Sequence, residues 1–259
     1  MKSGEIVDLA AISPKSTLMR SIRGNEISMI FQEPMTSLNP IFCIGEQIAE
    51  VIRLHQRVTR KEAFERAVAL LSEVHMPAPR QRAREYPHQI SGGMRQRAMI
   101  AIALACEPNL LIADEPTTAL DVTVQAQILK LIRELQEKRR MSVIFISHDL
   151  GVISEVCDRV AVMYLGHMVE RAPMSVIFSK PSHPYTQGLL GCIPDLAQNQ
   201  ENLFTIPGSV PTPINLPPGC PFASRCEFIM ERCRREMPPF EEVRPGHRAA
   251  CWLNHSPTP

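Results

Sequence analysis

The segment Ile90–Asp121, ISGGMRQRAMIAIALACEPNLLIADEPTTALD, decides how the rest of the chain is interpreted. It opens with a small hydroxyl residue and two glycines, Ser91-Gly92-Gly93, directly before an apolar stretch that predicts a helix. Backbone N–H groups at a helix N-terminus have no intrahelical partner, and the helix dipole favours an anion beside them. The front of the segment is therefore a candidate phosphate-binding site.

The back of the same segment predicts a buried strand that ends in two carboxylates. Leu110–Ala113 is a short apolar run, and Asp114 and Glu115 follow it directly. In open α/β sheets, ligands bind at the carboxyl ends of the strands. At such an edge Asp114 suits a partner of Mg²⁺, and Glu115 suits the group that polarises an attacking water.

In this order and at this spacing, the two pieces resemble motifs of the ATP-binding cassette (ABC) ATPases. The first piece matches the family signature, the second matches its Walker B strand, and Ala119-Leu120-Asp121 match its D-loop. The resemblance implies an α/β fold, that of a P-loop-NTPase-like ABC nucleotide-binding domain, with ATP and Mg²⁺ as ligands. The nucleotide-binding residues that it implies are Ser91, Gly92, Gly93 and Asp121.

Two further strands are expected to bring polar side chains to the same sheet edge. Ile27–Phe31 predicts a mostly apolar strand that ends at Gln32, and Ser142–Ser147 predicts a second buried strand that ends at His148. The stretch MIFQEPMTSLNP resembles the Q-loop of ABC ATPases that serve peptide transporters, and His148 matches the family's switch histidine. The resemblance implies catalytic roles for both beside Glu115, with Gln32 also near Mg²⁺ and a neutral His148 donating to the γ-phosphate. Ordinary polar residues at strand ends are the alternative.

Two helices are expected between the Q-loop and the signature, at Gly45–Leu54 and Arg60–Val74. Thr59 suits the N-cap of the second helix. By resemblance they form a helical subdomain over about residues 41–100, whose exposed apolar side chains would dock on a permease. Packing in an ordinary core explains the same apolar pattern. Asp121 is expected to cap another helix, whose apolar face is Val124, Ile128, Leu131, Ile132 and Leu135.

The phosphate-binding loop G-x-x-x-x-G-K-[ST] does not occur in the 259 residues. In the family it lies well upstream of the Q-loop, and the strand before it lies inside the sheet, so two strand edges are expected to lack a partner. A truncated or incomplete sequence is the favoured interpretation, because Gln32, Glu115 and His148 are all intact. The other is a subunit that has lost its own site. Because each ATP in an ABC dimer lies between one P-loop and the other subunit's signature, such a subunit would still serve its partner.

The C-terminal part differs in composition and carries two motifs. Ser182–Leu190 contains HPYTQ, which resembles a motif of oligopeptide and dipeptide transporter ATPases. Some relatives in this family hold a [4Fe–4S] cluster with a similar cysteine pattern, and four thiolates suit such a cluster. Packed or free thiols are the alternative. The expected domains are residues 1–172, a partial ABC ATPase domain, and residues 173–259, a C-terminal region. The four cysteines concerned are Cys220, Cys226, Cys233 and Cys251.

Composition narrows the function further. Apolar residues make up 44% and charged residues 21% of the chain, as in soluble globular proteins. The net charge of +1 gives no argument for nucleic-acid binding, and no apolar run is long enough to span a bilayer. The start does not resemble a signal peptide. We expect a peripheral protein on the cytoplasmic side of the plasma membrane.

The motifs together predict an ATP-hydrolysing subunit of a bacterial peptide importer. Its expected partners are a second ABC ATPase subunit, two transmembrane permease subunits and, indirectly, a peptide-binding protein outside the membrane. The alternative is a truncated, non-catalytic subunit or gene fragment that only supplies the signature to a partner's ATP site. A DNA-repair type of ABC ATPase is disfavoured, because the sequence has neither a long coiled-coil insertion nor a basic face.

Overall fold

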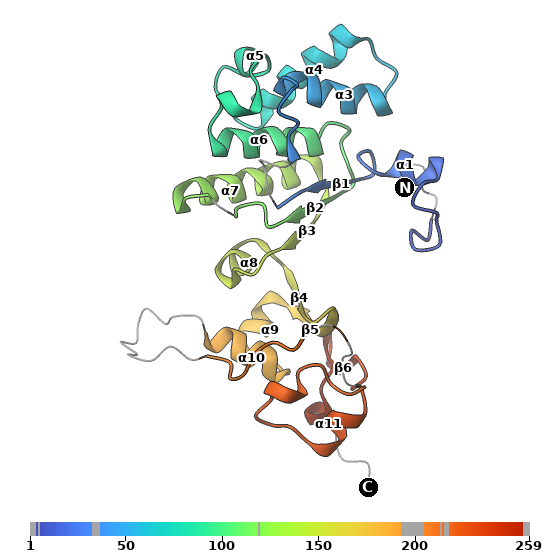
Figure 1. Ribbon diagram of the computed structural model, residues 1–259, viewed down its shortest axis with the longest axis vertical. Coiled ribbons are helices and arrows are strands. Elements are labelled where there is room, and N and C mark those ends of the chain that lie inside the picture. Colours follow the sequence, from blue (N-terminus) through green and yellow to red (C-terminus); the bar gives the residue numbers. More distant parts are fainter. Residues whose placement is uncertain are drawn as a thin grey trace. The chain divides into compact units, whose positions relative to one another are not determined.

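The chain forms two compact units, Met1–His148 and Asp149–Pro259, which are described separately (Figure 1). The computed structural model describes residues 4, 6–32, 37–118, 120–192, 205–212, 214 and 218–255. The elements of the first unit are α1 (Thr17–Ile22), β1 (Ile27–Ile30), α3 (Ile44–His55), α4 (Arg60–Glu73), α5 (Pro79–Arg82), α6 (Gly92–Ala103), β2 (Leu110–Asp114), α7 (Val122–Arg139) and β3 (Ser142–Ile146), with a short 3₁₀ turn at Pro87–Gln89.

A parallel sheet in the order β1-β2-β3 forms the base of the first unit. Ile27 pairs with Leu110, and Leu110 pairs with Ser142, so the three strands end at one edge. Gln32, Glu115 and His148 follow those ends within two residues, as expected for an α/β fold.

The strand predicted at Ser142–Ser147 is present as β3, but the prediction that it is buried was wrong. In β3, Ile144 is 49% exposed and Ile146 is 45% exposed. The reason is the face of the sheet: Ile144 and Ile146 point away from the core, whereas Val143 and Phe145 of the same strand pack against it. An apolar run of five residues predicts a strand, but not whether both of its faces are covered.

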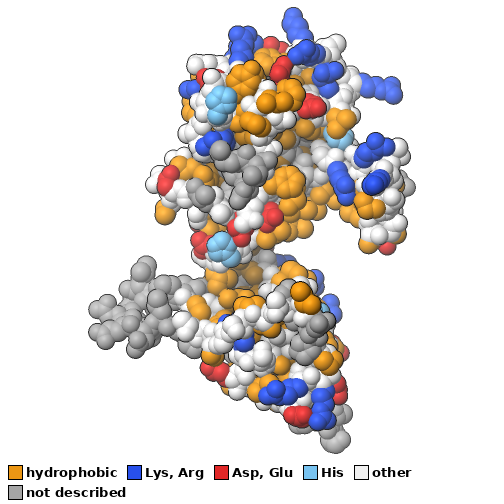
Figure 2. Space-filling model, viewed as in Figure 1, with side chains coloured by type: hydrophobic (Ala, Val, Ile, Leu, Met, Phe, Trp, Pro, Cys, Tyr) orange, Lys and Arg blue, Asp and Glu red, His pale blue; other side chains and the backbone are white. Residues whose placement is uncertain are grey.

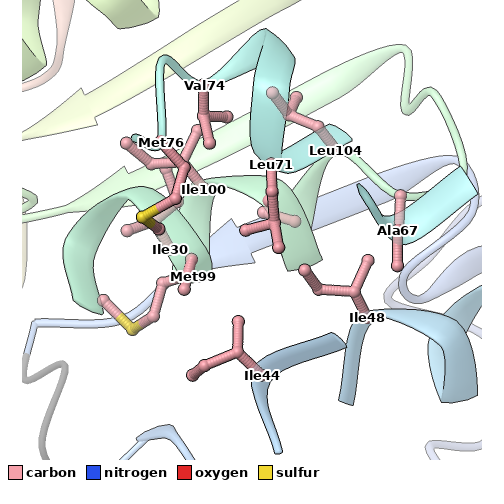
Figure 3. Close-up of a cluster of buried hydrophobic side chains, with 14 of the residues drawn as sticks. Ile30, Ile44, Ile48, Ala67, Leu71, Val74, Met76, Met99, Ile100 and Leu104 are labelled. Atoms are coloured by element: carbon pink, nitrogen blue, oxygen red, sulfur yellow. The ribbon is translucent and has the colours of Figure 1, made fainter. Parts of the chain in front are cut away.

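The hydrophobic core of the first unit lies between the sheet and the helices (Figure 3). Ile30 comes from β1, Ile44 and Ile48 from α3, Leu71 from α4 and Ile100 from α6, and each is at most 1% exposed. The helical region expected from the sequence is therefore largely core. Of the apolar face predicted for α7, Ile128, Leu131, Ile132 and Leu135 are buried and Val124 packs against the same core.

Four of the described helices of this unit begin at side-chain caps, the first being α1, where Ser16 accepts the backbone N–H of Met19. Thr59 accepts the backbone N–H of Glu62 at the start of α4, and Asp121 accepts that of Val124 at the start of α7. Both caps were predicted from sequence, and Ser91 caps α6 in the same way. Each cap satisfies an otherwise unpaired N–H group and fixes where the helix begins.

The second unit is built on an antiparallel sheet in the order β4-β5-β7-β6. The sequence-based boundary after residue 172 remains a prediction; in the structure, β5 pairs with β7 within this unit. No helix in the described ranges of the chain is long and apolar enough to cross a membrane. The elements are α8 (Leu150–Val156), β4 (Arg159–Tyr164), β5 (His167–Pro173), α9 (Met174–Ser179), α10 (Pro184–Gly191), α11 (Glu231–Arg235), β6 (Glu241–Arg244) and β7 (His247–Ala249), with 3₁₀ turns at Ala223–Arg225 and Trp252–Asn254.

Candidate functional site

The backbone at Glu115 turns sharply where β2 ends. Its φ of 44° lies in the left-handed region, which is unusual for a residue other than glycine. The Glu115 N–H donates to the carbonyl oxygen of Ile146, the last residue of β3, at 2.9 Å. Such a conformation costs about 1–3 kcal/mol and persists where neighbouring structure fixes it.

Three side chains from separate parts of the first unit converge on the Glu115 carboxylate. Gln32 donates through Nε2 to Oε2 at 2.8 Å, and Thr118 donates through its hydroxyl to the same oxygen at 2.9 Å. The Nδ1 atom of His148 lies 2.8 Å from Oε1. The structure therefore brings together the three predicted catalytic residues. It adds Thr118, which the sequence analysis missed; a hydroxyl three residues after the carboxylate, in a turn, was the available signal.

These hydrogen bonds also set the protonation state of the site. The bond from His148, followed by that from Thr118, holds the pKa of Glu115 below its ordinary value, and Gln32 adds to the effect. Glu115 is therefore ionised at neutral pH. A carboxylate only accepts hydrogen bonds, so a neutral His148 must carry its hydrogen on Nδ1. The result is a charged base with an oriented imidazole beside it.

Asp114 is the last residue of β2 and lies in register with Ile146. Asp114 and the amide oxygen of Gln32 are the predicted Mg²⁺ donors at this edge. Mg²⁺ bound to a nucleotide needs only one or two protein oxygens, because phosphates and waters supply the rest. No group of three or more His, Cys, Asp or Glu side chains within the described residues forms a metal site by itself. The rest of the predicted Q-loop, residues 33–36, lies outside those residues.

The predicted signature residues lie at the start of α6. The Ser91 hydroxyl accepts the backbone N–H of Met94 at 3.3 Å. A Cβ atom added to Gly93 would lie 3.0 Å from Cγ1 of Val124 on α7, so close helix packing favours glycine there. A Cβ atom at Gly92 would meet no atom within 4 Å. Packing within this chain therefore gives no reason for a glycine at position 92. Close approach of a ligand to the backbone would give one.

Of the predicted D-loop residues, Asp121 has a clear structural role. Asp121 is the N-cap of α7 and accepts the N–H of Val124 at 2.9 Å. Its carboxylate therefore has a structural role in this chain, and its predicted nucleotide contact stays a prediction. Ala119 lies outside the described residues.

The four C-terminal cysteines gather in the second unit, and none forms a disulfide. Burial, together with the nearby Cys220, Cys226 and Cys233, raises the pKa of Cys251 to about 11. A Cβ atom on Gly219 would lie 2.1 Å from the Cys233 carbonyl oxygen, and the Cys220 N–H donates to that oxygen at 2.8 Å. Glycine thus lets two cysteine-bearing segments lie in direct backbone contact.

Comparison with known proteins gives two family matches. The profile described as ABC transporter matches residues 1–118. The profile described as the C-terminal region of oligopeptide/dipeptide transporters matches residues 169–233. The second match includes HPYTQ and three of the four cysteines.

Individual relatives agree with these matches. The oligopeptide transport ATP-binding protein AppD of Bacillus subtilis is 56% identical, over 90% of this chain and 71% of AppD. The dipeptide transport ATP-binding protein DppD of the same organism is 52% identical, over 95% of this chain and 73% of DppD. Among solved structures, a dimeric post-hydrolysis state of the ATP-binding cassette MJ0796, bound to ADP and phosphate, has a TM-score of 0.54 and 28% identity. That likeness covers 61% of this chain and 66% of the other.

Proposed function

Because the chain belongs to the oligopeptide/dipeptide ABC transporter ATP-binding family, we propose that it is a subunit that binds and hydrolyses ATP to drive peptide import. The observation that carries the proposal is the convergence of Gln32, Thr118 and His148 on Glu115. A single ionised carboxylate held by three donors from separate segments suits a general base.

In the proposed reaction, Glu115 orients and deprotonates the water that attacks the terminal phosphate of ATP. Gln32 and His148 hold the carboxylate in place and lie beside the position where that phosphate would bind. Asp114 and the Gln32 oxygen would hold Mg²⁺, which when bound neutralises charge on the phosphates. The peptide itself would not touch this chain.

Ser91, Gly92 and Gly93 serve a second subunit in this proposal. Their backbone N–H groups at the start of α6 would contact the phosphates bound to the partner's P-loop. Since the 259 residues contain no G-x-x-x-x-G-K-[ST], the alternative function is that the chain supplies only this half-site. The two functions require different residues, so they are separable.

Phosphate release separates the two functions. In the first experiment, the P-loop segment of AppD is fused in front of Met1 and turnover is measured with ATP and Mg²⁺. Glu115→Gln is expected to lower the rate by about 100-fold or more, the usual contribution of a general base. Glu137→Gln, on an α7 glutamate whose side chain is 71% exposed, is the matched control and leaves the rate unchanged. Wild-type turnover in the Glu115→Gln fusion would refute the assignment.

In the second experiment, the chain without the fusion is mixed with a peptide-importer ATPase subunit that has a P-loop. If the chain supplies a signature, it stimulates phosphate release, and Gly92→Glu removes the stimulation by placing a carboxylate against the phosphates. A Cβ atom at Gly92 meets no atom within 4 Å, so this variant is expected to fold. Absence of stimulation by the unaltered chain would exclude the half-site function.

We further propose that a permease segment docks in a groove beside α3 and α4. The groove has a volume of about 670 Å³ and combines two aromatic side chains with charged ones. Figure 2 shows hydrophobic side chains next to basic ones on the part of the surface that these helices form. Phe42, which is 45% exposed, lines the groove, whereas Leu54, which is 76% exposed, does not. Phe42→Asp is therefore expected to abolish co-purification with the permease, with Leu54→Asp as the control. Such docking would place the chain at the cytoplasmic face of the membrane.

For the C-terminal cysteines we propose an iron–sulfur cluster held by Cys220, Cys226, Cys233 and Cys251. As placed, the four thiols do not form a metal site, but they form no disulfide and are the donors that a [4Fe–4S] cluster takes, and metal binding would deprotonate them. The cluster would stabilise the unit rather than transfer electrons. Iron and sulfide analysis after anaerobic purification tests this: Cys233→Ser is expected to lose both, and Cys157→Ser to retain them. Absence of iron from the wild-type chain would refute the cluster and support the interpretation that the thiols are packed or free.

A further inference from the structure

Gln96 is a buried polar residue of α6 that the proposed reaction does not use. Its side chain is 2% exposed, in a helix whose other buried residues include Ala98, Met99 and Ile100. A buried amide is costly unless it is hydrogen-bonded. Its Nε2 atom donates to the carbonyl oxygen of Pro116 at 2.5 Å, and Pro116 is the residue after Glu115.

This bond fixes the Pro116–Thr117 peptide, one residue beyond the strained Glu115. On one side, the Glu115 N–H is held by Ile146 of β3 at 2.9 Å. On the other side, Gln96 holds the Pro116 carbonyl, while the proline ring restricts the backbone between them. A φ of 44° at Glu115 persists only if its surroundings over-determine it. Gln96 of α6 is one of those constraints, and Ile146 of β3 is another.

The position of Gln96 along α6 gives the bond a second consequence. Gly92 and Gln96 are four residues apart, so they lie on one face of the helix, one turn from each other. The first turn of α6 carries the signature residues, and the next turn is bonded to the Glu115 turn. A rigid helical turn thus joins the two motifs that face two different nucleotides in the proposed dimer.

We infer that Gln96 is a positioning residue: it sets the direction of the Glu115 carboxylate and connects it to the signature end of α6. The inference rests on the proposed function for the importance of Glu115. The connection itself is measurable without nucleotide, because His148 reports on it. While the carboxylate stays in place, His148 remains the tautomer with hydrogen on Nδ1.

The experiment records the ¹⁵N shifts of the histidine rings in the unaltered 259-residue chain and in Gln96→Met, which keeps side-chain length and helix propensity but removes the donor. His148→Gln assigns the His148 signals among the eight histidines. The matched control is Gln47→Met. Gln47 is also a buried glutamine, 9% exposed, but it bonds to Asn39 and Phe42 at the start of α3.

We expect Gln96→Met to lose the Nδ1–H pattern of His148 and to show the averaged shifts of mixed tautomers, whereas Gln47→Met retains the wild-type pattern. A wild-type pattern in Gln96→Met, or an equal loss in both variants, would overturn the inference. If Gln96→Met does not fold, Gln96→Asn, whose amide is one methylene too short, is judged by the same two outcomes. An unchanged Glu115→Gln turnover would refute the proposed function alone, because this spectrum involves no ATP.

Discussion

Acid is expected to destabilise the second unit through one histidine of the HPYTQ motif. His183 is 1% exposed and is the N-cap of α10, where its Nδ1 accepts the N–H of Tyr185 at 3.0 Å. Its ring also lies 5.9 Å from that of Phe222. A proton on Nδ1 would remove the cap and place a charge in this buried position. The folded state therefore favours the neutral ring.

The magnitude follows from the difference between the folded and unfolded pKa values. Burial lowers the pKa of His183 to about 4, against an opposing effect of Glu170, while the unfolded value is about 6.5. Between these values the unfolded state binds more protons, so stability is complete above about pH 6.5 and falls as the pH decreases. At 1.36 kcal/mol per pKa unit, the loss is about 2.6 kcal/mol at about pH 4.5 and approaches about 3.4 kcal/mol below the folded pKa.

Urea unfolding at about pH 7.5 and about pH 4.5 measures this loss. Trp252 is the only tryptophan of the chain and lies in the second unit, so its fluorescence reports on that unit alone. His183→Asn keeps a side-chain acceptor at the N-cap but does not titrate. The pH-dependent loss is expected to be about 2.6 kcal/mol smaller in this variant than in the wild type. Equal losses in the two proteins would refute the reasoning.

Two further predictions concern the first unit, with far-UV circular dichroism as the probe and Trp252 fluorescence as the internal control. Arg139→Met is expected to lower the free energy of unfolding by about 1.5–3 kcal/mol, because it removes charge-assisted hydrogen bonds to Glu73 in a pair whose side chains are only 14% and 19% exposed; Arg133→Met, which breaks an exposed pair on the same helix, should cost under about 0.5 kcal/mol. Gly93→Ala is expected to destabilise α6 because its Cβ would approach α7 to 3.0 Å, whereas Gly92→Ala has free space and should not; equal effects would contradict the packing argument.

The part of the site that was predictable depends on strand topology. Parallel strands end at one edge, so polar residues after three apolar runs were expected to meet there, and Gln32 and His148 do contact Glu115. The caps at Thr59 and Asp121 were predictable because the capping bond is local in sequence. In each case the position of the residue follows from a local sequence pattern, either the end of an apolar run or the start of a helix.

The remainder depends on contacts that no local pattern encodes. Gln96 and Pro116 are far apart in sequence, and nothing in the motif indicates which side of α6 faces the turn. Ile144 is exposed because its face of the sheet lies away from the core, and an apolar run does not specify which face is covered. The cysteine spacing suggested a cluster, but the close approach of the backbone at Gly219 appears only in the folded chain.

The HPYTQ motif has a physical role that its use as a family marker does not suggest. Glu170 of β5 is fully buried, and its carboxyl oxygens accept the backbone N–H groups of Ser182 at 2.6 Å and His183 at 3.0 Å. Its Oε1 also lies 2.6 Å from Nε2 of His247 on β7. A buried carboxyl group needs such partners, since burial without them is costly. The loop that leads into the motif therefore solvates Glu170 from one side and β7 does so from the other. The HPYTQ motif therefore belongs to the contacts that connect the sheet of the second unit to α10. Substitutions in it should destabilise this unit rather than weaken nucleotide binding directly.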